Sequence, residues 1–238
     1  AVRIAKEYSC PVFILSDQAI ATRIEAFLEP DLKALMQDIS PDLSPRQEHK
    51  PYDLEAPDGV TRHLPLGARI ENGRYPVVTG LEHDEYGHPS GAPANHSLMS
   101  AKRRQKLQAL GRALPLPDIH GPKSGSTLLV GWGSTHGPIR EAVDQGLAKG
   151  MSLAANHIRH INPLPEGMET LFAGFDHVFV VEINDEGLYG YGQLCGLLRS
   201  RYCDPKIQGI NKCDGLTWRV RDILDEVSKR TGDAALAQ

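Results

Sequence analysis

The sequence predicts an α/β protein whose main domain is a mostly parallel sheet flanked by helices. A short, unbroken apolar run at 128–130 is typical of a strand that helices cover on both faces. A glycine-rich turn follows, and Ile139, Val143 and Leu147 then recur at helical spacing, which gives the next segment one apolar face. Strand and helix patterns alternate from there onward, as expected for parallel strands joined by right-handed crossovers.

The turn after this strand is made of small residues. Gly131, Gly133 and Gly137 allow a tight change of direction. Pro138 suits the first helical position, where a missing N–H costs nothing. Further strands are expected at 151–158, 177–183 and 207–210, and further helices at 166–172, 193–201 and 217–230, the last with Thr217 as its N-cap.

The first residues of the chain resemble the end of a helix. A strand at 11–15 and a helix from about residue 17 to residue 27 follow it. One strand with its helices cannot form a sheet alone. We therefore expect 1–29 to be the edge of a domain whose remainder lies upstream, and the chain to be a fragment or processed form of a longer polypeptide.

The segment 30–109 has a different composition. Up to about residue 76 it is rich in proline, aspartate, arginine and histidine and shows little periodicity. Such a stretch is typical of a linker, a binding loop or an arm laid over a neighbour. Within it, Asp58-Gly59 predicts a small hairpin and 101–110 a basic helix. The remaining residues, 110–238, form the expected α/β domain.

The totals exclude several classes of protein. The 238 residues include 26 Lys and Arg against 30 Asp and Glu, for a formal net charge of −4. Because the basic residues are scattered, a nucleic-acid partner is not expected. No apolar stretch approaches the length of a membrane span, and no signal peptide is recognisable near Ala1. We expect a cytoplasmic protein without a membrane partner.

The cysteines do not have the spacing of a metal site. Cys10, Cys195, Cys203 and Cys213 include no Cys-x-x-Cys pair. Iron–sulfur clusters and structural zinc sites need closer grouping. Reduced thiols are therefore expected at all four positions.

Two common catalytic or cofactor motifs are incomplete. The spacing of the three glycines in the turn is one residue off the dinucleotide fingerprint, and the next strand ends without the acidic residue that binds a ribose hydroxyl. Ser16, Ser126 and Ser134 lack the Gly-x-Ser-x-Gly elbow of a hydrolase nucleophile. Neither a nicotinamide enzyme nor a serine hydrolase is predicted.

The densest group of polar residues lies in the segment 82–88. Carboxylates and imidazoles so close together suit a divalent metal or proton transfer. The alternative is a loop whose charges pair with the basic residues of 102–106 or with another subunit, and we favour it because the spacing matches no standard metal motif. The candidate residues of this interface or polar site are Glu82, His83, Asp84, Glu85 and His88.

Glu182 is a further candidate. It ends an apolar strand, so its carboxylate must be hydrogen-bonded or solvated. We expect backbone N–H groups from 187–193, or a donor from another chain, to bind it, in a structural role. His157 and His160, three residues apart, are interpreted as satisfied polar side chains at a domain face rather than as ligands.

Four sequence blocks follow one another along nearly the whole chain. They are Pro11-Val-Phe-Ile-Leu-Ser-Asp-Gln18, Thr79-Gly-Leu-Glu-His-Asp-Glu-Tyr-Gly-His-Pro89, Val130-Gly-Trp-Gly-Ser-Thr-His-Gly-Pro138, and Val181-Glu-Ile-Asn184 with Gly192-Gln-Leu194. Together they resemble the α subunit of the 2-oxoacid:ferredoxin oxidoreductases, closest to the 2-oxoglutarate enzymes. The block at 79–89 is specific.

The resemblance implies a fold and an activity. The strand at 11–15 would be the last strand of a thiamine-pyrimidine domain, and about 110–230 a domain similar to the transketolase C-terminal domain. The family oxidatively decarboxylates a 2-oxoacid to its acyl-CoA and passes the electrons to ferredoxin. Thiamine diphosphate, Mg, an iron–sulfur cluster and CoA would belong to the full complex, which includes a thiamine-binding β subunit, and none of them to this segment.

The resemblance transfers no catalytic residue. Neither a Tyr-Pro-Ile-Thr-type nor an Arg-Gly-Gly-Pro-Ser-type motif is present, and the family has both upstream. We expect the segment to serve domain and subunit assembly and to be inactive alone. The alternative is a stand-alone binding or regulatory module that holds a small anionic ligand at the turn 131–137.

Overall fold

The computed structural model describes residues 1–35, 43–71 and 75–232. The chain divides into two compact units. The first unit comprises Ala1–Ile14 with Ile24–Ala113, and the second comprises Leu15–Arg23 with Leu114–Gln238. The predicted division into domains at 1–29, 30–109 and 110–238 stays a prediction.

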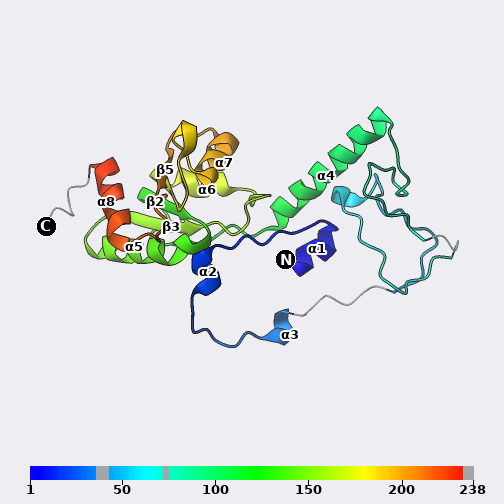
Figure 1. Cartoon of the computed structure of the whole chain (residues 1–238), viewed down its shortest axis with the longest axis horizontal. Helices are drawn as coiled ribbons and strands as arrows, with labels where there is room; N and C mark the ends of the chain where they lie inside the picture. Colours follow the sequence, from blue (N-terminus) through cyan, green and yellow to red (C-terminus); the bar gives the residue numbers. More distant parts are fainter. Residues whose placement is uncertain (36–42, 72–74, 233–238) are drawn as a thin grey trace. The chain divides into compact units, whose positions relative to one another are not determined.

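The second unit is built on a five-stranded sheet in the order β1-β3-β2-β4-β5. Strands β2, β3 and β5 are labelled in Figure 1. Four strands are parallel, and only the short β1 runs antiparallel, against β3. The predicted α/β class with a mostly parallel sheet is therefore confirmed. The strands are β1 (Ile119–His120), β2 (Gly125–Gly131), β3 (Leu153–His157), β4 (Phe175–Glu182) and β5 (Ile207–Asn211).

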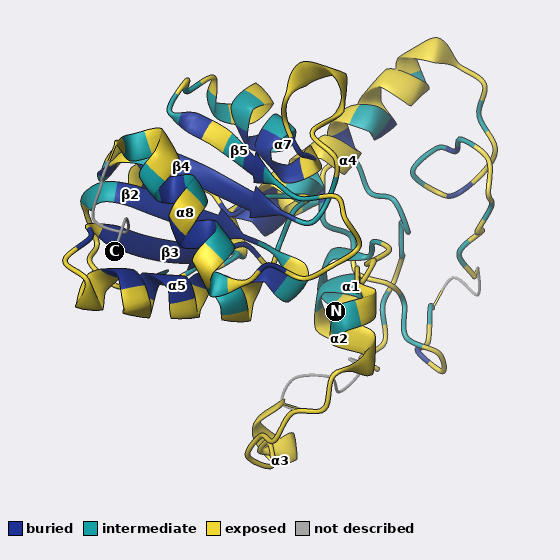
Figure 2. Ribbon diagram, turned by 60° about the vertical axis from the view of Figure 1, so that its left-hand side comes forward, coloured by how far each residue is buried: buried dark blue, intermediate teal, exposed yellow. Residues whose placement is uncertain are grey.

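Helices cover both faces of this sheet. The hydrophobic core on one face includes residues of α5 and α8, and the core on the other face includes residues of α6 and α7. Figure 2 shows the dark blue, buried strands between these layers. The helices of the second unit are α2 (Gln18–Thr22), α5 (His136–Ala148), α6 (Met168–Ala173), α7 (Gln193–Tyr202) and α8 (Val220–Thr231), and its 3₁₀ turns are η2 (Gly133–Thr135) and η3 (Gly187–Tyr189).

Strand β2 lies at the centre of the sheet, between β3 and β4. Leu128 and Val130 face the core under α6 and α7, while Leu129 faces the core under α5 and α8. All three side chains are 0% exposed. An unbroken apolar run is the pattern that such two-sided burial requires, so the prediction of a fully buried strand is confirmed.

The turn from β2 to α5 closes through a side chain. The hydroxyl Oγ1 of Thr135 donates to the carbonyl of Trp132 at 2.7 Å and accepts from the Trp132 N–H at 3.1 Å. The helix begins at His136, so Pro138 is its third residue and not its first, as was predicted. Proline is still tolerated there because the first N–H groups of a helix have no intrahelical partner.

Helix α8 begins later than the sequence predicted. Its N-cap is Arg219, and no side chain caps it, so the assignment of Thr217 as N-cap is wrong. The cause is Trp218, which is only 6% exposed and donates its indole N–H to the carbonyl of Glu182 at 3.0 Å. This tertiary contact holds the preceding residues outside the helix.

The first unit is organised on one long helix, α4, which is longer than the predicted helix at 101–110. Lys102 of α4 is buried and donates through Nζ to the carbonyl of Gly59 and to Thr61 Oγ1. Burial, together with nearby Lys106, lowers the pKa of Lys102 to about 8. The described elements of this unit are α1 (Val2–Tyr8), α3 (Leu32–Leu35), η1 (Pro57–Gly59) and α4 (Pro93–Ala113).

Three predicted elements differ from the structure. Residues 11–15 form no strand, and Phe13 and Ile14 are 84% and 80% exposed. A strand needs a neighbour to bond with, and no described residue pairs with this segment. The helix expected at 17–27 is reduced to α2, and the hairpin expected at Asp58-Gly59 is the 3₁₀ turn η1.

In the described part of the chain, no helix is both long enough and apolar enough to span a bilayer.

The close packing of the turn gives a testable prediction about Gly131. A Cβ at this position would lie 2.4 Å from Ile139 Cδ1 and 2.6 Å from Thr135 Oγ1. We expect Gly131→Ala to lower the free energy of unfolding by about 1–3 kcal/mol. Urea unfolding followed by tryptophan fluorescence measures it, because Trp132 and Trp218 both lie in the second unit.

Gly137→Ala is the matched control. A Cβ at Gly137 meets nothing within 4 Å, and alanine is a better helix former than glycine by up to about 1 kcal/mol. This variant should be as stable as the parent or more stable. Equal stability of the two variants would contradict the packing argument.

Candidate functional site

The loop 82–90 of the first unit is a compact turn held by its own backbone. The Ser90 N–H donates to the carbonyl of Glu82, and the Asp84 N–H donates to the carbonyl of His88, both at 2.9 Å. Gly87 has φ +89°, and a Cβ there would lie 1.9 Å from the carbonyl oxygen of Val77. Only glycine fits this position.

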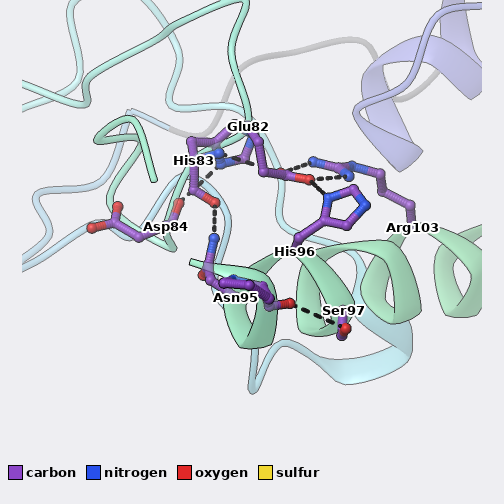
Figure 3. Close-up of polar contacts among 8 residues, drawn as sticks. Glu82, His83, Asp84, Asn95, His96, Ser97 and Arg103 are labelled. Atoms are coloured by element: carbon purple, nitrogen blue, oxygen red, sulfur yellow. Dashed lines mark hydrogen bonds and ion pairs between the residues drawn. The ribbon is translucent and has the colours of Figure 1, made fainter. Parts of the chain in front are cut away.

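Glu82 pairs with two side chains of α4 (Figure 3). Arg103 donates to both carboxylate oxygens, at 2.6 and 3.2 Å, and His96 Nδ1 lies 2.5 Å from Oε2. A bidentate guanidinium–carboxylate pair is among the stronger charged hydrogen bonds. The bonds from Arg103 and His96 lower the pKa of Glu82 to about 2.

His83 is held by contacts on several sides. Its side chain is buried, and its ring lies 3.7 Å, centroid to centroid, from the ring of Tyr52. Its Nδ1 lies 2.9 Å from the carbonyl oxygen of Asp84, and Asn95 donates to the carbonyl of His83 at 2.8 Å. Since a carbonyl oxygen only accepts, Nδ1 donates this hydrogen bond.

The other carboxylates of the loop have separate partners. Asp84 accepts the N–H groups of Tyr86 and His88, and these bonds outweigh the opposing effect of burial and lower its pKa. Glu85 forms an ion pair with Lys50 at 2.9 Å. The acidic and imidazole side chains therefore do not converge on one point, and no group of three or more His, Cys, Asp or Glu among the described residues is arranged to hold a metal ion.

Glu182 lies at the carboxyl end of β4 and is 0% exposed. Its Oε1 accepts the Cys195 N–H, and its Oε2 accepts the Leu194 N–H and the side-chain amide of Asn184, all at 2.9 Å. The two backbone donors belong to the first turn of α7, just beyond the segment 187–193 that the sequence indicated, whereas Asn184 precedes that segment. Burial and the carboxylate of Glu182 raise the pKa of the Cys195 thiol to about 12.

The turn between β2 and α5 already holds a carboxylate of this chain. Asp17 accepts the Ser134 N–H at 3.3 Å and the Ile20 N–H at 2.9 Å, the latter as the N-cap of α2. Burial opposes ionisation of Asp17, but the bonds from Ser134 and Ile20 lower its pKa overall. An external anion would have to displace this carboxylate to reach the Ser134 N–H.

The interpretation of His157 needs correction. Its Nδ1 is buried and has no hydrogen-bond partner among the described residues, so the ring is not fully satisfied as predicted. His136, which no sequence motif marked as a site residue, lies with its ring centroid 4.6 Å from that of His157. The signal that could have found it was its place where the glycine turn enters the helix.

No family model matches the chain. It does resemble curated proteins over most of its length. The 2-oxoglutarate oxidoreductase subunit KorA of Mycobacterium tuberculosis is 31% identical over 238 residues, which cover 96% of this chain and 33% of that protein. Subunit alpha of the 2-oxoacid:ferredoxin oxidoreductase 2 of Aeropyrum pernix is 29% identical over 218 residues, which cover 89% of this chain and 32% of that subunit.

The chain is also similar to a solved structure. It is the 2-oxoglutarate:ferredoxin oxidoreductase from Magnetococcus marinus with 2-oxoglutarate, coenzyme A and succinyl-CoA bound. The TM-score is 0.64 at 28% identity, and the match covers 75% of this chain and 30% of that chain. The chain spans about a third of the length of the curated relatives it matches.

By fold, the second unit is an α/β domain with a mixed, mostly parallel sheet. By sequence and structure, the chain is similar to the α subunits of 2-oxoacid:ferredoxin oxidoreductases, including those of the 2-oxoglutarate type. The resemblance inferred from the four sequence blocks is confirmed.

The buried carboxylate of Glu182 gives the second prediction. In Glu182→Gln, one of the three donors would face an amide NH₂ group, and an unsatisfied buried donor costs about 1–3 kcal/mol. We expect the free energy of unfolding in urea to fall by about 2 kcal/mol. Glu186→Gln, at an exposed position shortly after β4, should leave the free energy of unfolding unchanged. A Glu182→Gln variant of parental stability would contradict the structural role.

The Glu82–Arg103 pair gives the third prediction. The pKa of Glu82 in the folded chain, about 2, lies below its ordinary value of 4.5, so the pair stabilises the first unit above about pH 4.5. This stabilisation is lost as the pH falls toward 2. In Arg103→Gln the pKa of Glu82 should rise toward 4.5.

An NMR titration of the side-chain carboxyl carbons measures this pKa. Arg104→Gln is the control, since Arg104 is exposed and follows Arg103 on the same helix. It should leave the pKa of Glu82 near its parental value. An unchanged pKa in Arg103→Gln would show that the ion pair does not form in solution.

Proposed function

We propose that the chain is the C-terminal part of the α subunit of a 2-oxoacid:ferredoxin oxidoreductase, of the 2-oxoglutarate type. The complex would oxidatively decarboxylate the 2-oxoacid to its acyl-CoA and pass the electrons to ferredoxin. The observation that supports this is the similarity over 96% of the chain to a 2-oxoglutarate oxidoreductase subunit. In this proposal the segment serves domain and subunit assembly in a cytoplasmic hetero-oligomer.

The exposed apolar side chains of 11–15 support the proposal that the N-terminal region packs against a part of the α subunit outside this chain. Four consecutive apolar side chains are exposed there, with exposed fractions from 37% to 84%; they belong to Val12, Phe13, Ile14 and Leu15. Such a run is typical of a strand buried on both faces. In the proposal, 1–29 completes a thiamine-pyrimidine domain formed by the rest of the α subunit, and 110–238 is the domain similar to the transketolase C-terminal domain.

The loop 82–88 is proposed to face another domain or subunit. His88 in the loop is exposed, and so is the apolar side chain of Leu81, the residue before the loop, at 67%. The inner contacts to α4 fix the loop before any partner arrives, which lowers the entropy cost of binding. Glu182 has a scaffold role in the same proposal, since three donors of its own chain bind its carboxylate.

The family resemblance implies thiamine diphosphate, Mg, an iron–sulfur cluster and CoA in the complete enzyme. The described residues do not offer a donor set for the metal-containing groups: no group of three or more His, Cys, Asp or Glu is placed to ligate a metal, and Cys195 is a buried thiol of raised pKa. We assign these groups to the rest of the complex, with the thiamine site in a β subunit, and derive no catalytic step in this segment.

Reconstitution tests the proposal. The chain alone should show no oxidation of 2-oxoglutarate with CoA and a ferredoxin. Together with the upstream two-thirds of a related α subunit and its β subunit, it should support turnover and copurify with them. Hydrogen exchange should then slow in 82–88 relative to the isolated chain.

Three outcomes would overturn parts of the proposal. Turnover by this chain alone would show that it is not an assembly segment. A reconstituted complex that oxidises no 2-oxoacid would contradict the activity. Unchanged exchange in 82–88 within an active complex would place the loop outside every interface.

A further inference from the structure

Four basic side chains gather where β2 and β3 end and α5 begins. Gly131 and His157 are paired residues at the ends of the two strands, and Arg159 follows two residues later. His136 is the first residue of α5, and Arg140 lies one turn further on the same side of the helix. Elements far apart in the sequence thus bring these four side chains to one edge of the sheet.

The two imidazoles of this basic cluster are in contact. Their ring centroids are 4.6 Å apart, with 52° between the ring planes. The buried Nδ1 of His157 has no hydrogen-bond partner among the described residues. It lies 3.6 Å from where a Cβ of Gly131 would be, so any residue but glycine would narrow the space beside it.

The charges of this cluster are not balanced within the described part of the chain. Neither Arg140 nor Arg159 has an ion pair there. The carboxylate of Asp144 is close, but it is bonded to His120 at 2.6 Å. Two unpaired guanidinium groups therefore share one edge of the sheet with two imidazoles.

Every charged neighbour lowers the affinity of these imidazoles for a proton. Burial, and then Arg140, Arg159, Arg23 and His120, lower the pKa of His136. Burial, with His136 and Arg159, lowers the pKa of His157 to about 4. At neutral pH both rings are neutral, and a negative charge between them and the arginines would reverse this effect.

We propose that His136, Arg140, His157 and Arg159 form a binding site for a phosphate-type dianion. Two guanidinium groups supply paired N–H donors that match phosphate oxygens, and the imidazoles add donors once they are protonated. The positive end of the α5 dipole favours the same charge. The site is separate from the Ser134 N–H, which Asp17 occupies, and does not depend on the proposed oxidoreductase function.

Binding of the dianion must couple to protonation. An anion that binds the protonated imidazoles more tightly raises the pKa of His136 and His157. Affinity should therefore increase as the pH falls from about 6.5 toward 4, where His136 and His157 take up protons. Arg23 and His120 lower the pKa of His136 whether or not the anion is bound, so they do not change the direction of this coupling.

The experiment is a titration of the purified chain with inorganic phosphate, pyrophosphate and AMP, followed by the histidine ring C–H signals in NMR spectra. At saturation we expect the pKa of His136 and of His157 each to rise by about 1. Arg140→Gln and Arg159→Gln should each weaken binding roughly tenfold. Comparable affinity for phosphate and AMP would indicate a site for phosphate alone, and much tighter binding of AMP a nucleotide phosphate.

Lys149→Gln is the control, because it removes one positive charge at the other end of α5. It should leave affinity unchanged and thereby separate the basic cluster from the overall charge of the chain. No saturable binding of any of the three probes, or an equal loss of affinity in Lys149→Gln, would overturn the proposal.

Discussion

Strand β2 has no face turned to water, because Leu128, Leu129 and Val130 are fully buried on alternating sides. A strand of this kind is stable only if helices cover both faces of its sheet. The chain meets this condition because β3 lies next to β2 on one side and β4 on the other, and a helix connects each of these strands to the next. The loops that follow these strands consequently meet at the carboxyl edge, where parallel sheets usually bind ligands.

Glu182 shows how the same edge is held together. A buried carboxylate is costly unless it is fully hydrogen-bonded. Here three donors satisfy it, and its backbone carbonyl additionally accepts from the indole of Trp218 and from the Lys212 N–H. The residue thus joins the end of β4, the start of α7 and the approach to α8. These contacts support the proposed scaffold role of Glu182.

In the first unit, the dense group of polar residues at 82–88 forms separate contacts. Glu82 binds Arg103 and His96, Glu85 binds Lys50, and Asp84 holds backbone N–H groups of its own loop. A stable loop that turns its inner groups to α4 has its outer surface free for a partner.

The sequence alone determined the α/β class, the order of β2 to β5 and of α5 to α8, and the ion pair of the polar loop with the basic helix. The fold class could be predicted because buried strands and amphipathic helices place apolar residues at regular spacing. The ion pair could be predicted because the loop is acidic and the helix is basic. It also carried the family resemblance, through four short blocks. The start of α8, the state of 11–15 and the donors to Glu182 were decided by tertiary structure, since each depends on which distant residue is in contact. The basic cluster of His136, Arg140, His157 and Arg159 exists only in three dimensions, because the ends of two parallel strands and the start of a helix must meet before these charges face one another.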